Sequence, residues 1–102
     1  MKVNVKITSV HFDADKKLIA FIQERVNKLS VFYDKIIDSE VILKLENTPE
    51  AENKVAEIKL LIPGSDAFAK KQCKSFEEAT DAAVEALRRQ LKRHKEKLKK
   101  VW

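Results

Sequence analysis

Apolar and polar residues alternate over the first ten positions of the chain. Val3, Val5 and Ile7 each stand between polar residues. A period of two is typical of a strand with one buried face, so we expect a strand over residues 2–9.

The spacing of apolar residues then changes to three or four, which predicts an amphipathic helix of about 18 residues. Its apolar positions are Leu18, Phe21 or Ile22, Val26, Leu29 and Phe32 or Tyr33. Asp15 stands where this helix needs an N-cap, with Asp13 just before it. The two carboxylates could instead be a pair of catalytic acids, but capping accounts for their position.

Three further runs predict strands. Alternation returns over residues 36–45 and 55–62, and a short polar loop between them predicts a hairpin. Pro63-Gly64 then stops the second run. Residues 67–74 form a candidate third antiparallel strand whose register is open, because either alternate set of its side chains could face the core.

Ser75 and Glu78 have the Ser-x-x-Glu spacing of a capping box, which predicts the start of a second helix. No Gly or Pro follows, so this helix is expected to run for about 25 residues, roughly 38 Å. Its apolar stripe is dense early and thins toward Leu98, so the last turns should project beyond the core.

The element order is therefore β-α-β-β-β-α, and the fold class is α+β. Both helices are amphipathic and the strands alternate, so we expect a four-stranded sheet with the two helices on one face. At 102 residues the chain has room for one modest core, so residues 1–102 should form a single domain.

Cysteine content and hydropathy limit the environment. The one cysteine, Cys73, excludes an internal disulfide and a cysteine-based zinc site, and it favours the reducing cytoplasm. No run approaches the roughly 18 apolar residues of a membrane span, and the N-terminus lacks a signal segment. We therefore expect no membrane partner, and the whole chain as the mature protein.

The net charge of +5 is an average over two unlike parts. Residues 88–100 hold eight basic residues and one acidic residue, a net of +7, and the rest of the chain has a net of −2. On a helix, Arg88, Lys92, Lys95 and Lys99 form one ridge, with Arg89, Arg93 and Lys100 beside it. A helix end that is merely solvated is the alternative, but ordinary solvated faces mix both signs, so this run favours an anionic partner. If the partner is structured RNA, phosphate contacts and shape should dominate, with little sequence specificity. Charge alone leaves double-stranded RNA, ribosomal RNA and an acidic membrane surface open, although the far side of this run has too few apolar residues for strong membrane insertion.

Catalytic motifs are missing from the sequence. The two histidines, His11 and His94, fall on different predicted elements, and the single glycine, Gly64, leaves no phosphate-binding loop. Cys73 has no histidine pattern beside it and is interpreted as an inert small residue. His94 could contact nucleic acid or merely be solvated. We expect no enzyme activity, metal or cofactor.

The segment Leu87–Lys99, with its Arg-Gln-Leu followed by a basic His-Lys run, and the order of elements resemble the ribosome hibernation promoting factors. These are also called ribosome-associated translation inhibitors, within the sigma-54 modulation protein family. The end of the first helix, Glu24–Leu29, and Pro63-Gly64 look like that family too. The resemblance covers essentially the full chain.

The resemblance implies a fold like that of double-stranded-RNA-binding domains, and docking in the channel of the small ribosomal subunit where messenger and transfer RNA bind. Translation would be blocked in stationary phase without catalysis. The residues expected to contact ribosomal RNA are Arg25, Lys28, Arg88, Arg89, Lys92, Arg93, Lys95 and Lys99. We expect no DNA partner and a monomer when free.

The chain departs from the family pattern in two places. The tyrosine often found at the start of the second helix is absent, and Ala86 stands where a basic residue sometimes occurs. The chain also resembles the short form of the family, without a separate dimerisation domain.

The alternative function is a protein-interaction module whose basic helix binds an acidic protein and regulates transcription.

Overall fold

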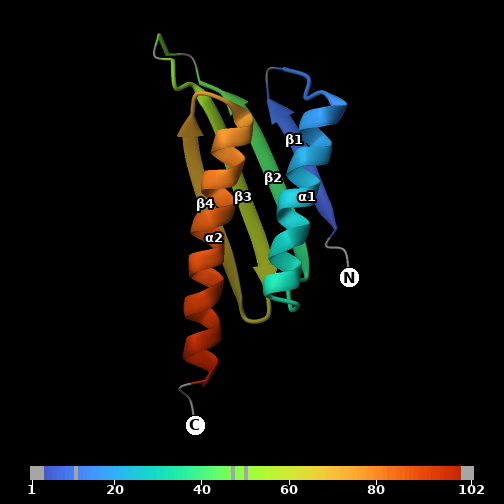
Figure 1. Cartoon of the computed structure of the whole chain (residues 1–102), viewed down its shortest axis with the longest axis vertical. Helices are drawn as coiled ribbons and strands as arrows, with labels where there is room; N and C mark the ends of the chain where they lie inside the picture. Colours follow the sequence, from blue (N-terminus) through green and yellow to red (C-terminus); the bar gives the residue numbers. More distant parts are fainter. Residues whose placement is uncertain (1–3, 11, 47, 50, 100–102) are drawn as a thin grey trace.

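The computed structural model describes residues 4–10, 12–46, 48, 49 and 51–99, with the backbone alone for residues 97–99. The expected order β-α-β-β-β-α is confirmed (Figure 1). The elements are β1 (Val5–Val10), α1 (Lys16–Phe32), β2 (Asp38–Leu45), β3 (Lys54–Ile62), β4 (Ser65–Cys73) and α2 (Phe76–Lys99).

The four strands form one sheet in the order β1-β2-β3-β4. β1 runs parallel to β2, because α1 crosses over between them, and the other pairs are antiparallel. α2 lies over β3 and β4 and beside α1, so both helices cover the same face of the sheet, as expected (Figure 1). The opposite face is left uncovered by helices; we call it the open face.

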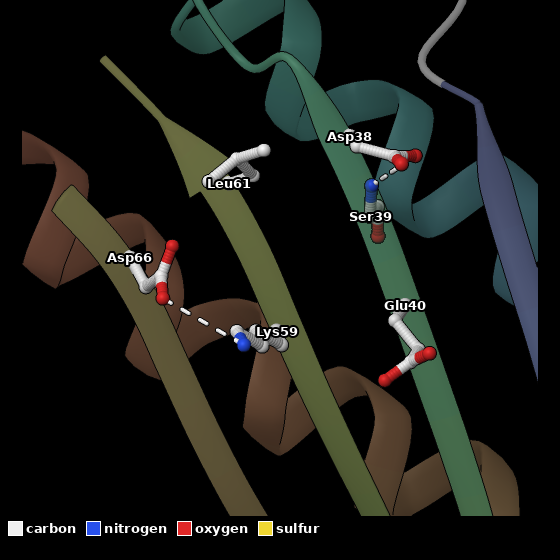
Figure 2. Close-up of a pocket in the computed structure, with 6 residues that line it drawn as sticks. All are labelled: Asp38, Ser39, Glu40, Lys59, Leu61 and Asp66. Atoms are coloured by element: carbon white, nitrogen blue, oxygen red, sulfur yellow. Dashed lines mark hydrogen bonds and ion pairs between the residues drawn. The ribbon is translucent and has the colours of Figure 1, made fainter. Parts of the chain in front are cut away.

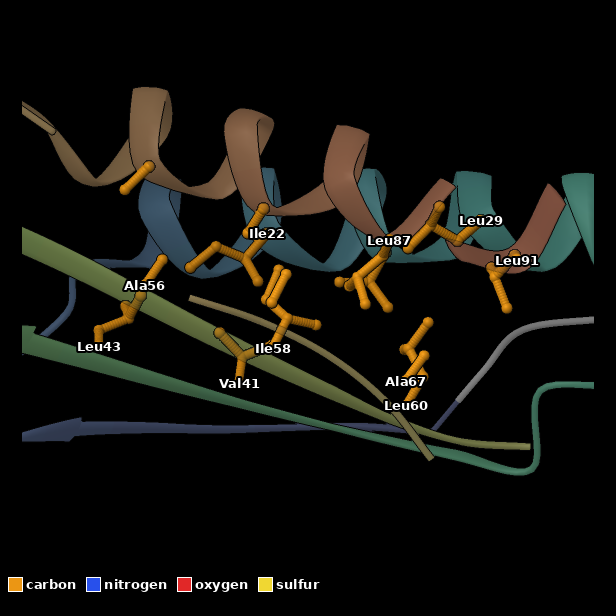
Figure 3. Packing of buried hydrophobic residues seen from close by; sticks show 14 of the residues in the cluster. Ile22, Leu29, Val41, Leu43, Ala56, Ile58, Leu60, Ala67, Leu87 and Leu91 are labelled. Atoms are coloured by element: carbon orange, nitrogen blue, oxygen red, sulfur yellow. The ribbon is translucent and has the colours of Figure 1, made fainter. Parts of the chain in front are cut away.

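The core fills the space between the helices and the sheet, as Figure 3 shows. Val41, Leu43, Ile58 and Leu60 point from β2 and β3 toward Ile22, Val26, Leu87 and Leu91 of the helices, and all eight are fully buried. The structure shows which alternate set of β4 side chains faces the core. Ala67 and Ala69 face the core, because these small side chains leave room for α2, whereas Phe68 faces outward.

Both helix starts are as the sequence predicts. The Asp15 carboxylate accepts a hydrogen bond of 2.8 Å from the Leu18 N–H, and the Ser75 hydroxyl accepts one of 3.1 Å from the Glu78 N–H. Each satisfies a backbone donor that has no partner within its helix. Asp15 therefore has a structural role.

The turn between β3 and β4 is tight, since Ile62 and Ser65 are paired across it. Gly64 has a φ of 76°, which only glycine adopts without strain, and Pro63 supplies the fixed φ that precedes such a residue in a type II turn. Beyond this turn α2 continues, so the end of the helix projects past the sheet (Figure 1). The projecting segment is the basic one.

Candidate nucleic-acid interface

The second half of α2 presents a ridge of cations. Arg88, Arg89, Lys92 and Arg93 are exposed, and Lys95 is half-buried. The helix is unbroken to Lys99, so the backbone carries the predicted spacing of four, three and four along the ridge. The side chain of Lys99 lies outside the described residues.

Arg25 belongs to the seam between the helices, which we define as the surface where α1 and α2 meet on the side away from the sheet. Its Nε lies 2.9 Å from Oδ1 of Asp81 on α2, and its guanidinium lies over the ring of Phe21, 4.6 Å from the centroid. Only 31% of the side chain is exposed. The ion pair fixes Arg25 and offsets part of its charge.

Phe32 joins the end of α1 to the ridge. Arg88 Cζ lies 5.3 Å and Lys95 Nζ 4.8 Å from the centroid of its ring, and Lys95 Nζ also donates to the Phe32 carbonyl at 3.3 Å. Lys28 lies one turn before Phe32 on the same face of α1, with Nζ 3.7 Å from Glu24 Oε1. Lys28, Arg88 and Lys95 therefore flank the seam from both sides.

Arg89 and Arg93 lie on the other flank of α2, toward β4. Arg89 Nε is 3.9 Å from Glu85 Oε1 on the same helix. Arg93 borders a hollow with Ser65 and Asp66 at the start of β4. The predicted residues of α2 thus form two flanks of that helix, with Lys92 exposed along the ridge between them.

Gln90 fixes the position of α2 over the sheet. Its Nε2 donates to the Phe68 carbonyl at 2.7 Å, and its Oε1 accepts from the Phe68 N–H at 3.3 Å. β4 is an edge strand, so these bonds occupy backbone groups that no neighbouring strand pairs. The role was not predicted from the sequence, although a polar residue between Leu87 and Leu91 of the apolar stripe was a signal.

His94 is half-buried and contacts another aromatic ring, so it is not merely solvated, and its contact with nucleic acid stays a prediction. Its ring packs edge-on against Tyr33, with the centroids 5.9 Å apart and the planes at 86°. Tyr33 is 4% exposed, and burial, with a smaller contribution from Asp34, raises the pKa of its hydroxyl above the usual 10.0. The pair therefore extends the core toward the basic end of α2.

Cys73 lies at the end of β4 and is half-buried. Burial, more than the nearby acids, raises the pKa of its thiol, which disfavours the thiolate. No group of three His, Cys, Asp or Glu side chains that could hold a metal occurs among the described residues. No described helix is long and apolar enough to cross a membrane.

A hollow on the open face contrasts with the ridge (Figure 2). Lys59 Nζ lies 3.7 Å from Asp66 Oδ2, and Asp38 Oδ1 accepts from the Ser39 N–H at 2.9 Å. Asp38, Glu40 and Asp66 against Lys59 give the lining of this hollow a net negative charge. The hollow is therefore opposite in sign to the basic half of α2.

Comparison with known proteins gives a consistent picture. Residues 5–99 match the family model described as Sigma 54 modulation protein / S30EA ribosomal protein. The ribosome hibernation promoting factor of Pseudomonas putida is 34% identical over 95 residues, which are 93% of this chain and 89% of the relative. The factor of Escherichia coli K12 is 27% identical over 97 residues, which are 95% of this chain and 98% of the relative.

Solved structures share the fold. A ribosomal subunit interface protein from Coxiella burnetii superimposes with a TM-score of 0.80 at 17% identity, covering 91% of this chain and 98% of that one. The N-terminal domain of Thermus thermophilus Protein Y gives 0.76 at 20% identity, covering 92% and 99%. The likeness to double-stranded-RNA-binding domains stays a prediction.

Proposed function

The chain belongs to the Sigma 54 modulation protein / S30EA ribosomal protein family, and from this premise we propose that it is a ribosome hibernation factor. It binds the small ribosomal subunit in the channel for messenger and transfer RNA, and it inhibits translation in stationary phase. The names of the Pseudomonas putida and Escherichia coli relatives support this role. Its place of action is the cytoplasm, where ribosomes work.

One observation carries the proposal: the exposed half of α2 is a surface of nearly one sign on a rigid helix. Residues 88–99 hold seven basic residues and one acidic residue. Like charges on one helix face repel each other by a few tenths of a kcal/mol per pair. A polyanion removes this repulsion and gains the phosphate contacts that arginine and lysine make.

The two flanks of α2 have different parts in this proposal. Arg88, Lys95 and Lys28, with Arg25 behind them, bind the RNA backbone from the seam, and Lys92 and Lys99 extend that contact along the ridge. Arg89 and Arg93 bind a neighbouring part of the backbone from the β4 side. Phosphate contacts fix orientation without reading bases, so the shape of the ribosomal channel supplies the selectivity.

Inhibition follows from occupancy. A chain seated in the channel excludes messenger and transfer RNA without any chemical step, so no catalytic residue is needed. Release then depends on competition and on ionic strength, since each neutralised phosphate contributes about 0.7 to 0.9 to the slope of log affinity against log salt.

Reversal of Arg89 and Arg93 tests the proposal. We expect Arg89→Glu with Arg93→Glu to abolish co-sedimentation with ribosomes and inhibition of translation in a cell-free system. Both side chains are exposed, so the melting temperature should change little. An inhibitor of unchanged potency would refute the assignment of these residues.

The matched control is Lys16→Glu with Lys17→Glu. This double substitution makes the same change in net charge in the first turn of α1. Acidic side chains there interact favourably with the helix dipole, so they should not destabilise the helix. This control should bind ribosomes with little loss.

Nuclease treatment of the purified complex distinguishes the ribosomal role from the alternative, a module that binds an acidic protein. Digesting the RNA should release a ribosomal partner, whereas an acidic protein partner should stay bound.

A further inference from the structure

The aromatic ring of Phe32 contacts two cations of the ridge that stand two helical turns apart. Arg88 Cζ and Lys95 Nζ lie 5.3 Å and 4.8 Å from its centroid. The backbone of the same residue accepts the hydrogen bond from Lys95 Nζ at 3.3 Å. One residue of α1 thus restrains two basic side chains of α2.

Restraint matters because arginine and lysine have many rotamers. Ordering such a side chain at an interface costs about 0.5 to 1.5 kcal/mol, and a side chain ordered before binding avoids that cost. The negative face of an aromatic ring attracts a cation placed over it. The cation's N–H groups that point away from the ring stay available to bind an anion. Phe32 can therefore order Arg88 and Lys95 without using up their capacity to bind phosphate.

We propose that Phe32 is a positioning residue of the interface, which holds Arg88 and Lys95 in the orientation that binds the RNA backbone. The inference rests on the proposed function and adds a residue that carries no charge and contacts no RNA itself. In the sequence Phe32 was only one of two alternatives for an apolar position of the helix.

The test compares Phe32→Leu, which keeps an apolar side chain and removes the π face, with Phe32→Tyr, which keeps that face. Affinity for purified ribosomes is measured at several salt concentrations. Two cation–π contacts at exposed sites correspond to about five- to thirty-fold in affinity, so Phe32→Leu should bind that much more weakly. Phe32→Tyr should bind like the unchanged chain.

The slope of log affinity against log salt concentration shows whether a variant has lost a cation or only the ordering of its cations. Phe32→Leu keeps every cation, so its slope should equal that of the unchanged chain, whereas Arg88→Ala should lower the slope by about one contact. Phe76→Leu is the matched control. Its ring stacks on Phe12 with centroids 4.6 Å apart and lies away from the basic half of α2, so binding should not change.

A double-mutant cycle separates positioning from general damage to the fold. In a chain that already carries Arg88→Ala and Lys95→Ala, Phe32→Leu should have no further effect on affinity. A merely structural role would weaken binding by the same factor in both backgrounds. Thermal unfolding of each variant shows whether it is folded under the conditions of the assay.

The outcomes distinguish the two proposals. An unchanged chain that does not bind ribosomes overturns both. An unchanged chain that binds, together with Phe32→Leu that binds as tightly or more tightly, overturns the positioning role and leaves the proposed function standing.

Discussion

The two halves of α2 share one unbroken helical backbone but differ in charge and packing. Residues 76–87 contain four acidic residues and no basic one, and residues 88–99 contain seven basic residues and one acidic residue. The first half buries Ala79, Thr80, Ala83 and Leu87. In the second half Leu91 is buried, and the helix then passes the end of the sheet (Figure 1). One half is built for folding, and the other half presents charge.

Helix stability explains only part of this difference. Acidic residues near the start and basic residues near the end of a helix are favourable, but the effect is confined to the first and last turns. Arg88 and Arg89 lie near the middle of α2, which ends at Lys99. Their charge needs another reason, and a polyanionic partner supplies one.

The largest expected effect is on folding, and it tests whether the first half of α2 stabilises the fold while the second half binds the partner. Leu87 is fully buried, so Leu87→Ala should lower the free energy of unfolding by about 2 to 5 kcal/mol in denaturant titrations. Lys92→Ala, five residues further along the helix and exposed, should change stability by no more than about 0.5 kcal/mol and weaken ribosome binding instead. Equal losses of stability would show that the two halves do not divide folding from binding.

Gln90 is the structural exception within the basic half. Gln90→Met removes both hydrogen bonds to Phe68 and should lower the free energy of unfolding by about 1 to 3 kcal/mol, because each of the two bonds contributes about 0.5 to 1.5 kcal/mol. Amide hydrogen exchange at Phe68 should accelerate. Gln72→Met, which removes one bond to the Glu52 carbonyl, is the control. Unchanged exchange at Phe68 would refute the role of Gln90 at the sheet edge.

Asp81 is the exception within the acidic half, because it reaches the seam. Asp81→Asn should cost less than about 1 kcal/mol of stability, since its ion pair with Arg25 is partly exposed. Removing one negative charge beside the interface should strengthen ribosome binding about twofold at low salt. Glu77→Gln makes the same change in charge at the start of the helix and should have a smaller effect. Weaker binding by Asp81→Asn would mean that the pair holds Arg25 in its binding position.

Local patterns predicted the elements well. Apolar spacing located every helix and strand, and the caps at Asp15 and Ser75 depend only on residues three positions away. The ridge was also predictable, because a helix fixes the relation of Arg88 to Lys92 and Lys95 by its own geometry. These features need no knowledge of the rest of the fold.

Contacts between elements could not be predicted in the same way. The Arg25–Asp81 pair depends on how the two helices cross, and the bonds between Gln90 and Phe68 depend on the register of β4, whose alternating pattern left two choices. Phe32 and Tyr33 were alternatives for one core position. In the structure Tyr33 enters the core and Phe32 meets the cations.

The most direct test of the central claim is the salt dependence of ribosome binding. For the unchanged chain, log affinity should fall linearly with log salt, with each phosphate contact contributing about 0.7 to 0.9 to the slope. Neutralising Arg89 and Arg93 with glutamine should reduce the slope by about two contacts, and neutralising Lys16 and Lys17 should leave it unchanged. Affinity that is insensitive to salt, or equal losses from both pairs, would contradict the assignment of ribosome binding to the second half of α2.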